Sequence, residues 1–596
     1  MKNLSFTLAV MISLANPIPA RADEPAPPSS SANEGRAVAL GATEIKMDTE
    51  VPLNAFVLGQ TPAIEIQLVT SADAADGNAR LTLERTDLIT GEVRVDEIEV
   101  VLRAGETLTL EQAYPPVAGL FRIRAKLAGS GAAAGEAESA LSATLEYACS
   151  PARWAVDLPD DWPLAAHVAG RIPPLPGFKR FRYFAHWARN NPAPDVYRWD
   201  EFDRVFEEVK NVGGKLMIAY DGSPLWTSSR GKTGMSWISN ATAYPPDDMR
   251  DLEVYITEMM SRYKDDRGTI DRLELCNEPN TLARWHGTPE EYVETAIAFR
   301  QGIENAEPGH PVRLVGLAIS AGDQYGFVMR QIEAGILDHV DAVSAHWYEE
   351  MMSYEKETPI NNMLRHVDML KDPMERAGRS LPMVNSECGI QFVPRENGRI
   401  LTQGEINERD EANEDWNAND KWLIGKKWRS VSEYRAAAGY VAGAVMLLHE
   451  QVMPSYFFSH FSFLVDGVPS LPWVALGRLG CYLDGVDYHH TEQLEARVVG
   501  SDGGDGSPRA LAYLIGRPGE RQVIVAWAFL SDTSVGRSKH WQAWLEPVEV
   551  QIDTAAPEAI ASDLYGRETV RLTNADGKLT VKCGEEPVFI APPSKP

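Results

Sequence analysis

Positive charge is scarce in this sequence of 596 residues, and long apolar runs are missing after its first residues. Lys and Arg number 57 against 85 Asp and Glu, which gives a formal net charge of −28. A field of this sign repels the phosphates of nucleic acids and of anionic lipid headgroups. We therefore expect no nucleic-acid partner. The lack of a further run of about 20 apolar residues predicts no membrane span.

Cysteine is also rare. The chain has an odd number of cysteines, so at least one is unpaired within it, and their spacing fits no zinc or redox motif. Cys276 and Cys388 each lie within two residues of a glutamate discussed below. We interpret them as packed apolar residues, with active-site thiols as the alternative. We expect neither a metal ion nor a cofactor. The five cysteines are Cys149, Cys276, Cys388, Cys481 and Cys583.

The first 22 residues have the pattern of a signal peptide. Lys2 precedes an apolar stretch over residues 4–14, and Ala20-Arg21-Ala22 fits the small-x-small cleavage rule. The sequence thus predicts a secreted or periplasmic protein whose mature chain begins at Asp23. Residues 23–36 are rich in Pro, Ser, Ala and Glu, a composition that predicts a flexible lead because it buries too little apolar area to fold.

Three folded regions follow from the hydrophobic patterns. Residues 37–149 hold short alternating runs broken by Gly and Asp turns, which predicts an N-terminal β-sandwich. Residues 150–486 alternate apolar runs with amphipathic helical stretches, the pattern of βα units around a parallel sheet. Residues 487–596 return to alternating strands and predict a C-terminal β-sandwich. The predicted fold class is α/β, with a (β/α)8 TIM barrel between two β-sandwich modules.

Seven barrel strands can be placed from their apolar runs, and the missing first strand is expected between residues 152 and 173. The seven predicted strands are 181–184, 215–220, 272–276, 312–319, 342–346, 383–386 and 455–458.

Two glutamates follow apolar strands at equivalent positions. Glu278 lies in Asn277-Glu278-Pro279 after one strand, and Glu387 ends another, 109 residues later. That separation leaves room for three βα steps, so we expect the glutamates on strands four and seven. The carboxyl ends of barrel strands meet on one face. Glycoside hydrolysis needs a carboxylic acid and a carboxylate across such a site. The alternative interpretation is a pair of ion-paired strand-end carboxylates.

With these motifs, residues 178–461 resemble a clan A glycoside hydrolase, nearest to the β-xylosidase and α-L-iduronidase type. The matching stretches are 177–183, 196–203, 223–226 and 346–348. The resemblance implies a retaining mechanism without a cofactor, in which Glu278 is the acid/base and Glu387 the nucleophile. It implies that Asn277 binds the sugar 2-hydroxyl and Arg182 keeps Glu387 ionised. His346 and Tyr348 would line the substrate cleft.

Other residues keep two interpretations. Arg182 and His346 are also residue types that buried strand ends use for packing. Trp226 and Trp285 are candidate sugar platforms, although large aromatic side chains serve equally well in a core. The charged stretch 395–429 is either a loop that shapes substrate selection or a solvated helical hairpin.

The expected substrate is a poly- or oligosaccharide whose O-glycosidic bond is cleaved. The mechanism needs the pKa of Glu278 raised by burial and by its partner's charge, while Glu387 stays ionised. The alternative function is a non-catalytic carbohydrate-binding or surface scaffold protein on a glycosidase-like barrel. The sequence leaves the sugar, the linkage and the oligomeric state open.

Overall fold

The structure is a computed structural model. It describes residues 43–593 except 75, 130–140, 169–173, 321–324, 349–362, 391, 394, 397–398, 413–430, 459–462, 466, 505 and 531–544. The predicted signal peptide, 1–22, and the predicted lead, 23–36, lie outside the described residues, as does most of the charged stretch 395–429. No helix among the described residues is both long enough and apolar enough to cross a membrane.

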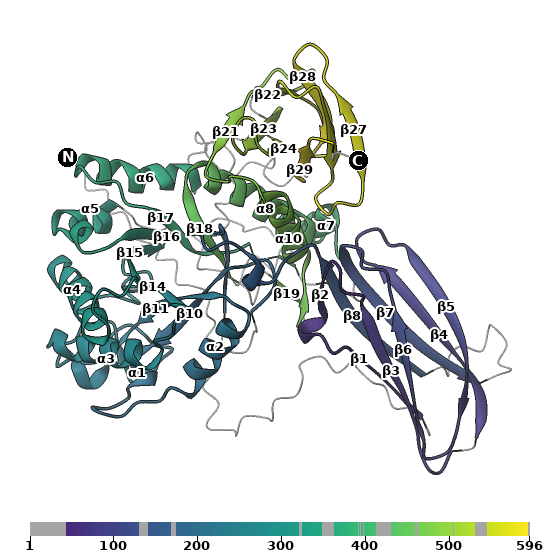
Figure 1. The fold of residues 1–596 in the computed structure, drawn as a ribbon, viewed down its shortest axis with the longest axis horizontal. Coiled ribbons are helices and arrows are strands. Elements are labelled where there is room, and N and C mark those ends of the chain that lie inside the picture. The colour runs from purple at the N-terminus through teal and green to yellow at the C-terminus, as the bar shows by residue number, and fades with distance from the viewer. Residues whose placement is uncertain are drawn as a thin grey trace.

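Eight parallel strands form a closed barrel, which confirms the predicted fold class (Figure 1). The barrel closes because its first strand pairs with both the second and the last strand. This first strand lies within the stretch 152–173 where the sequence predicted it. In chain order the strands are β9 (Leu164–His167), β10 (Arg180–His186), β11 (Lys215–Asp221), β14 (Ile270–Glu274), β15 (Arg313–Ser320), β16 (Ala342–Trp347), β17 (Met383–Cys388) and β18 (Val452–Phe457).

Amphipathic helices cover the barrel. Helix α2 buries Phe202, Val205, Phe206 and Val209, which recur three and four residues apart and therefore share one face. Helix α4 begins at a capping box between Thr288 and its third helical residue. The helices are α1 (Trp187–Asn190), α2 (Asp200–Asn211), α3 (Met249–Arg262), α4 (Pro289–Ala306), α5 (Tyr325–Glu333), α6 (Met363–Arg376), α7 (Gln403–Ala412), α8 (Glu433–His449) and α10 (Leu471–Leu483).

The N-terminal module is a β-sandwich of two sheets with its own core. Ile64, Ile66 and Leu68 alternate with more exposed residues along β3, so one face of the strand lines the core. The first sheet contains β1 (Thr43–Asp48), β3 (Ala63–Thr70) and β6 (Thr107–Ala113). The second contains β2 (Ala55–Val57), β8 (Leu141–Ser150), β7 (Gly119–Gly129), β4 (Gly77–Asp87) and β5 (Val93–Leu102).

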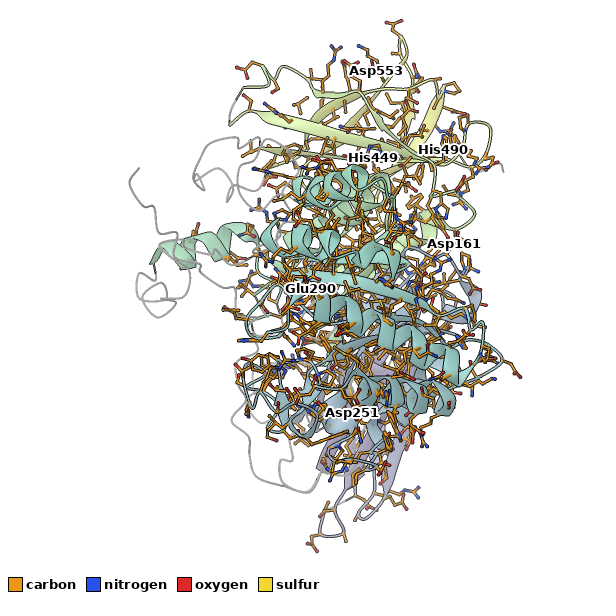
Figure 2. All side chains as sticks on the ribbon, turned by 90° about the vertical axis from the view of Figure 1, so that its left-hand side faces the viewer. Asp161, Asp251, Glu290, His449, His490 and Asp553 are labelled. Carbon is orange, nitrogen blue, oxygen red and sulfur yellow. The ribbon has the colours of Figure 1, made fainter. Side chains whose placement is uncertain are left out.

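The C-terminal module is a second β-sandwich, and it packs on α8 and α10 (Figure 1). The Phe589 ring stacks on Tyr482 with centroids 4.5 Å apart, and the His449 and Tyr513 rings lie 5.1 Å apart at this boundary. Figure 2 shows His449 between the barrel and the C-terminal module. One sheet contains β21 (Thr491–Leu494), β23 (Pro508–Ile515), β24 (Val523–Leu530), β29 (Val588–Ala591), β26 (Glu558–Ser562) and β27 (Thr569–Thr573). The other contains β22 (Ala496–Val498), β25 (Val548–Asp553) and β28 (Lys578–Cys583).

One arginine joins the two β-modules directly. The Arg567 guanidinium in the C-terminal module donates to Asp87 Oδ2 at 2.6 Å and to the Ala118 carbonyl at 2.8 and 3.0 Å. Both side chains of the ion pair are largely buried, with 14% and 15% exposed. Buried charge-assisted hydrogen bonds stabilise more than surface pairs do. The contact therefore holds the N-terminal and C-terminal β-modules against each other.

We predict that Arg567→Ala destabilises the protein by about 1.5–3 kcal/mol, the usual range for hydrogen bonds to a charged group. Thermal and denaturant unfolding would measure the loss. Arg571→Ala is the matched control, because Arg571 pairs with Glu558 on the same module at a surface site. Equal unfolding midpoints for the two variants would show that the contact between modules does not stabilise the fold.

Candidate active site

The two predicted glutamates lie at the carboxyl ends of barrel strands four and seven. Glu387 is the penultimate residue of β17, and Glu278 follows β14 by four residues. The Glu278 backbone donates to the Ala318 carbonyl on β15 at 2.9 Å and has φ +47°, in the left-handed region. Such a conformation is unfavourable for a residue with a side chain and needs support from its surroundings. Both side chains are almost fully buried.

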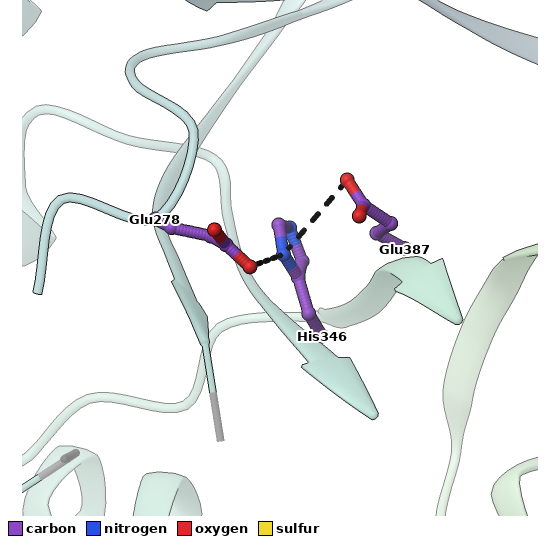
Figure 3. Close-up of side chains that lie close together, drawn as sticks. All are labelled: Glu278, His346 and Glu387. Atoms are coloured by element: carbon purple, nitrogen blue, oxygen red, sulfur yellow. Dashed lines mark hydrogen bonds and ion pairs between the residues drawn. The ribbon is translucent and has the colours of Figure 1, made fainter. Parts of the chain in front are cut away.

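His346, at the end of β16, lies between the two carboxylates (Figure 3). Its Nδ1 atom is 3.2 Å from Glu278 Oε1 and 4.0 Å from Glu387 Oε2. One carboxylate oxygen of each glutamate and one His346 nitrogen all lie within 4.8 Å of one another. These are also residue types that bind divalent cations, so a metal ion in this site would be held by these three groups.

Arg182 on β10 binds the strand-seven glutamate, and its side chain is fully buried. Its Nη1 donates to Glu387 Oε2 at 2.8 Å, and its Nη2 donates to the amide oxygen of Asn277 at 2.6 Å. Its Nε donates to Glu274 Oε2 at 2.8 Å, and Nη2 contacts the same oxygen. His167 on β9 contacts Nη1 as well. One guanidinium therefore ties four barrel strands or their ends together.

Tyr348 also reaches the strand-seven glutamate. Its hydroxyl donates to Glu387 Oε1, whereas Arg182 donates to the other carboxylate oxygen, Oε2. The structure thus brings together six of the eight residues that the sequence singled out. These are Glu278, Glu387, Asn277, Arg182, His346 and Tyr348.

The two predicted tryptophans lie in different surroundings. Trp285 is 6% exposed and packs edge-on against Tyr292 with ring centroids 5.4 Å apart. A ring with this little exposure belongs to the core, the second of its two interpretations, and offers no open face to a sugar. Trp226 is half-buried, packs edge-on against Trp187 and donates from its indole nitrogen to the Asn191 carbonyl at 3.0 Å.

Sequence reasoning missed Glu274, a third carboxylate in the site. Glu274 is fully buried at the end of β14, where it binds Arg182 and accepts from the Ser344 hydroxyl at 2.9 Å. Burial raises its pKa, but the charges of Arg182 and His346 and the hydrogen bonds from Ser386 and Arg182 together outweigh burial and hold the pKa below its usual range. The signal was present, because Glu274 is the one charged residue in the apolar run Leu273 to Cys276. A charge there needs a buried partner.

Arg284 and Asp221 were missed too. Arg284 follows β14 in the chain, and its Nη1 donates to Asp221 Oδ2 at the end of β11 at 2.7 Å. Its guanidinium stacks over the Trp237 ring at 4.2 Å, and its Nε lies 3.9 Å from Glu278 Oε2. No residue spacing in the sequence links these segments. The contacts place a second cation beside the pair of glutamates.

The charges of the glutamate pair differ from the expectation. Burial raises the pKa of Glu278, but the hydrogen bond and charge of His346 and the charges of Arg284 and Arg182 outweigh it, so the pKa is lowered. Burial raises the pKa of Glu387, and the Glu278 carboxylate adds to this against His346 and Arg182. The sequence predicted the reverse order. The two carboxylates differ because His346 hydrogen-bonds to Glu278, whereas the Glu278 charge itself raises the pKa of Glu387.

Comparisons with known proteins extend this description. No protein-family model and no curated protein matches the chain. Among solved structures, the chain is similar to a family 39 glycoside hydrolase from the gut symbiont Bacteroides cellulosilyticus WH2, with 14% identity and a TM-score of 0.57 over 91% of this chain and 99% of that one. It is also similar to a family 39 β-xylosidase from Caulobacter crescentus, with 16% identity, 74% and 98% coverage and a TM-score of 0.42.

The chain therefore shares the fold of the Bacteroides family 39 glycoside hydrolase, which confirms the resemblance seen in the sequence at the level of the fold. The likeness to the Bacteroides enzyme spans nearly all of both chains, so it includes the flanking β-regions as well as the barrel.

Proposed function

We propose that this protein is a retaining glycoside hydrolase that cleaves an O-glycosidic bond of a poly- or oligosaccharide. The observation that carries the proposal is the buried pair of Glu278 and Glu387, which face each other from strands four and seven with carboxylate oxygens within 4.8 Å. Retaining enzymes hold their carboxyl groups about 5–5.5 Å apart, whereas inverting enzymes leave about 6.5–9.5 Å for a water molecule. The short separation favours direct attack by one carboxylate.

Glu387 is the proposed nucleophile. Its oxygen attacks the anomeric carbon and forms a glycosyl ester while the bond to the leaving-group oxygen breaks and Glu278 protonates that oxygen. Glu278 then takes a proton from water, the water oxygen attacks the anomeric carbon, and Glu387 leaves as a carboxylate. Arg182 and Tyr348 bind one Glu387 oxygen each, so both stabilise the carboxylate that leaves.

The cycle needs a proton on Glu278, whereas in the free site His346 and Arg284 lower the pKa of Glu278, and burial and the Glu278 carboxylate raise that of Glu387. Two carboxylates this close titrate together, because the charge of one disfavours ionisation of the other. A sugar whose anomeric carbon contacts Glu387 and whose glycosidic oxygen contacts Glu278 favours the proton on Glu278. Substrate binding therefore favours the state that the cycle needs, with Glu278 protonated and Glu387 ionised.

Asn277 is proposed to orient the sugar. Arg182 binds its amide oxygen, which fixes the amide plane and reserves the NH2 group for donation. A sugar hydroxyl next to the anomeric carbon is a suitable acceptor, and such bonds strengthen in the transition state. The predicted signal peptide supports an activity outside the cytoplasm, on extracellular or periplasmic polysaccharides.

Hydrolysis of a panel of aryl glycosides by the purified protein tests the proposal directly. Release of the aryl alcohol with retention at the anomeric carbon, followed by NMR, is the expected result. A panel without turnover, combined with measurable binding of oligosaccharides, would instead identify a carbohydrate-binding protein.

Glu278→Gln should slow turnover of a glycoside with a poor leaving group by about 10²–10⁴-fold, the usual contribution of a general acid. Formation of the glycosyl ester from a dinitrophenyl glycoside should be nearly unchanged, because that leaving group needs little protonation. Steady-state and burst kinetics on both substrates measure the difference. Equal losses on the two would contradict the acid role of Glu278.

Glu387→Ala should be inactive alone, because it removes the nucleophile. Azide fits the vacated space and attacks from the same face, so it should restore turnover of an activated substrate and yield the inverted glycosyl azide. In the wild-type protein, a fluorinated activated substrate should trap the glycosyl ester. Peptide mapping that finds the label on another residue would refute the assignment.

Arg284→Met should move both limbs of the pH–activity profile to higher pH. The Arg284 charge lowers the pKa of Glu278 and of Glu387, so its removal lets each carboxylate take up a proton at a higher pH. Glu387 then becomes ionised, and Glu278 loses its proton, only at higher pH. Arg230→Met is the control, because Arg230 also stacks on an aromatic ring, Tyr244, and pairs with carboxylates away from the site. A shift in only one limb would show that Arg284 acts on one glutamate.

A further inference from the structure

The strand beside Glu278 has an irregular backbone at the level of the site. β15 shifts register against β16 between Gly316 and Ile319. Within this bulge Leu317 has φ +71° and Ala318 has φ +41°, while Glu278 has φ +47°. Residues with side chains rarely adopt such angles, and they persist only where surrounding contacts hold them. Three such residues in contact indicate that neighbouring residues hold this backbone in place.

Two sets of contacts join the Glu278 segment to this bulge. The Glu278 backbone N–H donates to the Ala318 carbonyl at 2.9 Å, in the bulge itself. Two residues further along the chain, Asn280 Nδ2 donates to the Ser320 carbonyl at 2.9 Å, and the Ser320 N–H donates to Asn280 Oδ1 at 2.9 Å. A side-chain amide that bonds both polar groups of one residue fixes that residue in register. The position of Glu278 thus depends on the position of the bulge.

The bulge is held from behind by a helix. Tyr292, in the first turn of α4, is fully buried, and its hydroxyl accepts from the Leu317 backbone N–H at 3.0 Å. Trp285 packs edge-on against the Tyr292 ring at 5.4 Å, and Phe327 does so at 5.7 Å. These rings leave Tyr292 little freedom. Its hydroxyl is therefore a fixed acceptor for an N–H group that the bulge has turned away from the strand ladder.

We propose that Tyr292 and Asn280 are positioning residues for Glu278. Tyr292 fixes the β15 bulge from the helix side, and Asn280 fixes the end of β15. The hydrogen bond from the Glu278 N–H to the Ala318 carbonyl then sets the position of the Glu278 backbone relative to the bulge. The inference rests on the proposed acid/base role of Glu278. A general acid must lie within hydrogen-bond reach of the leaving-group oxygen. A small displacement of the Glu278 backbone would therefore weaken protonation and leave attack by Glu387 intact.

Tyr292→Phe tests this, because it removes one oxygen atom and keeps the ring. On a methoxyphenyl glycoside, a poor leaving group, kcat/KM should fall about ten- to a hundredfold, the scale expected when a reacting group is displaced by a fraction of an ångström to one ångström. On the dinitrophenyl glycoside of the same sugar it should fall less than about threefold. Asn280→Ala should show the same selectivity, and it serves if Tyr292→Phe does not fold.

Tyr255→Phe is the matched control. Tyr255 is also a buried tyrosine on a barrel helix, and its hydroxyl accepts from Asn190 at 3.2 Å, away from the β15 bulge. Both Tyr→Phe variants should lower the unfolding midpoint, but only Tyr292→Phe should show leaving-group selectivity. Equal losses on both substrates, or no loss, would overturn the positioning role.

Glu278→Gln, measured on the same two glycosides, separates the two levels of the proposal. If Glu278→Gln is selective and Tyr292→Phe is not, the positioning role fails and the function stands. If Glu278→Gln shows no selectivity, the acid/base assignment itself fails.

Discussion

The buried charge of Arg182 is the constraint on which the rest of the site depends. A guanidinium with no solvent exposure is stable only if anions and acceptors surround it, because desolvation of a charge costs several kcal/mol. Its partners Glu274, Asn277, Glu387 and His167 come from β9, β14 and β17 or their ends. The proposed nucleophile is therefore also a counter-ion of the barrel. The ion pair between Arg182 and Glu387 therefore serves both the stability of the barrel and the proposed chemistry.

The neighbours of each carboxylate account for the pKa shifts of the proposed catalytic pair. At Glu387, burial and the charge of Glu278 raise the pKa against the charges of His346 and Arg182. Glu387, buried and close to Glu278, consequently holds a proton more readily than an arginine neighbour alone would suggest. His346 and Arg284 in turn favour the charged form of Glu278. The proposed cycle needs the opposite distribution of the proton, so contacts with the substrate are expected to set it.

Much of this architecture could be predicted from the sequence, because apolar strands followed by polar residues carry a strong local signal. The seven visible strands, the place of the first one and the strand numbers of Glu278 and Glu387 all follow from that pattern. Arg284 could not be predicted, since its contacts with Asp221 and Trp237 join two loops and the end of β11 by tertiary packing. The pKa order could not be predicted either. The order of the two pKa values depends on the distances from each carboxylate to the buried charged groups around it. Residue spacing along the chain does not give these distances.

Trp285 shows how the outer layer of the barrel reaches the chemistry. The sequence left it as either a sugar platform or a core residue, and its ring lies against Tyr292 on the helix side. In a barrel whose strands are covered on both faces, a residue beyond a strand end can turn either into the site or back under the helices. An aromatic that turns back stiffens the support of the loop that carries the proposed acid. Residues with side chains keep positive φ angles only where surrounding contacts hold them, so this packing, together with the bonds of Glu278 and Asn280 to β15, fixes the backbone from which Glu278 is proposed to act.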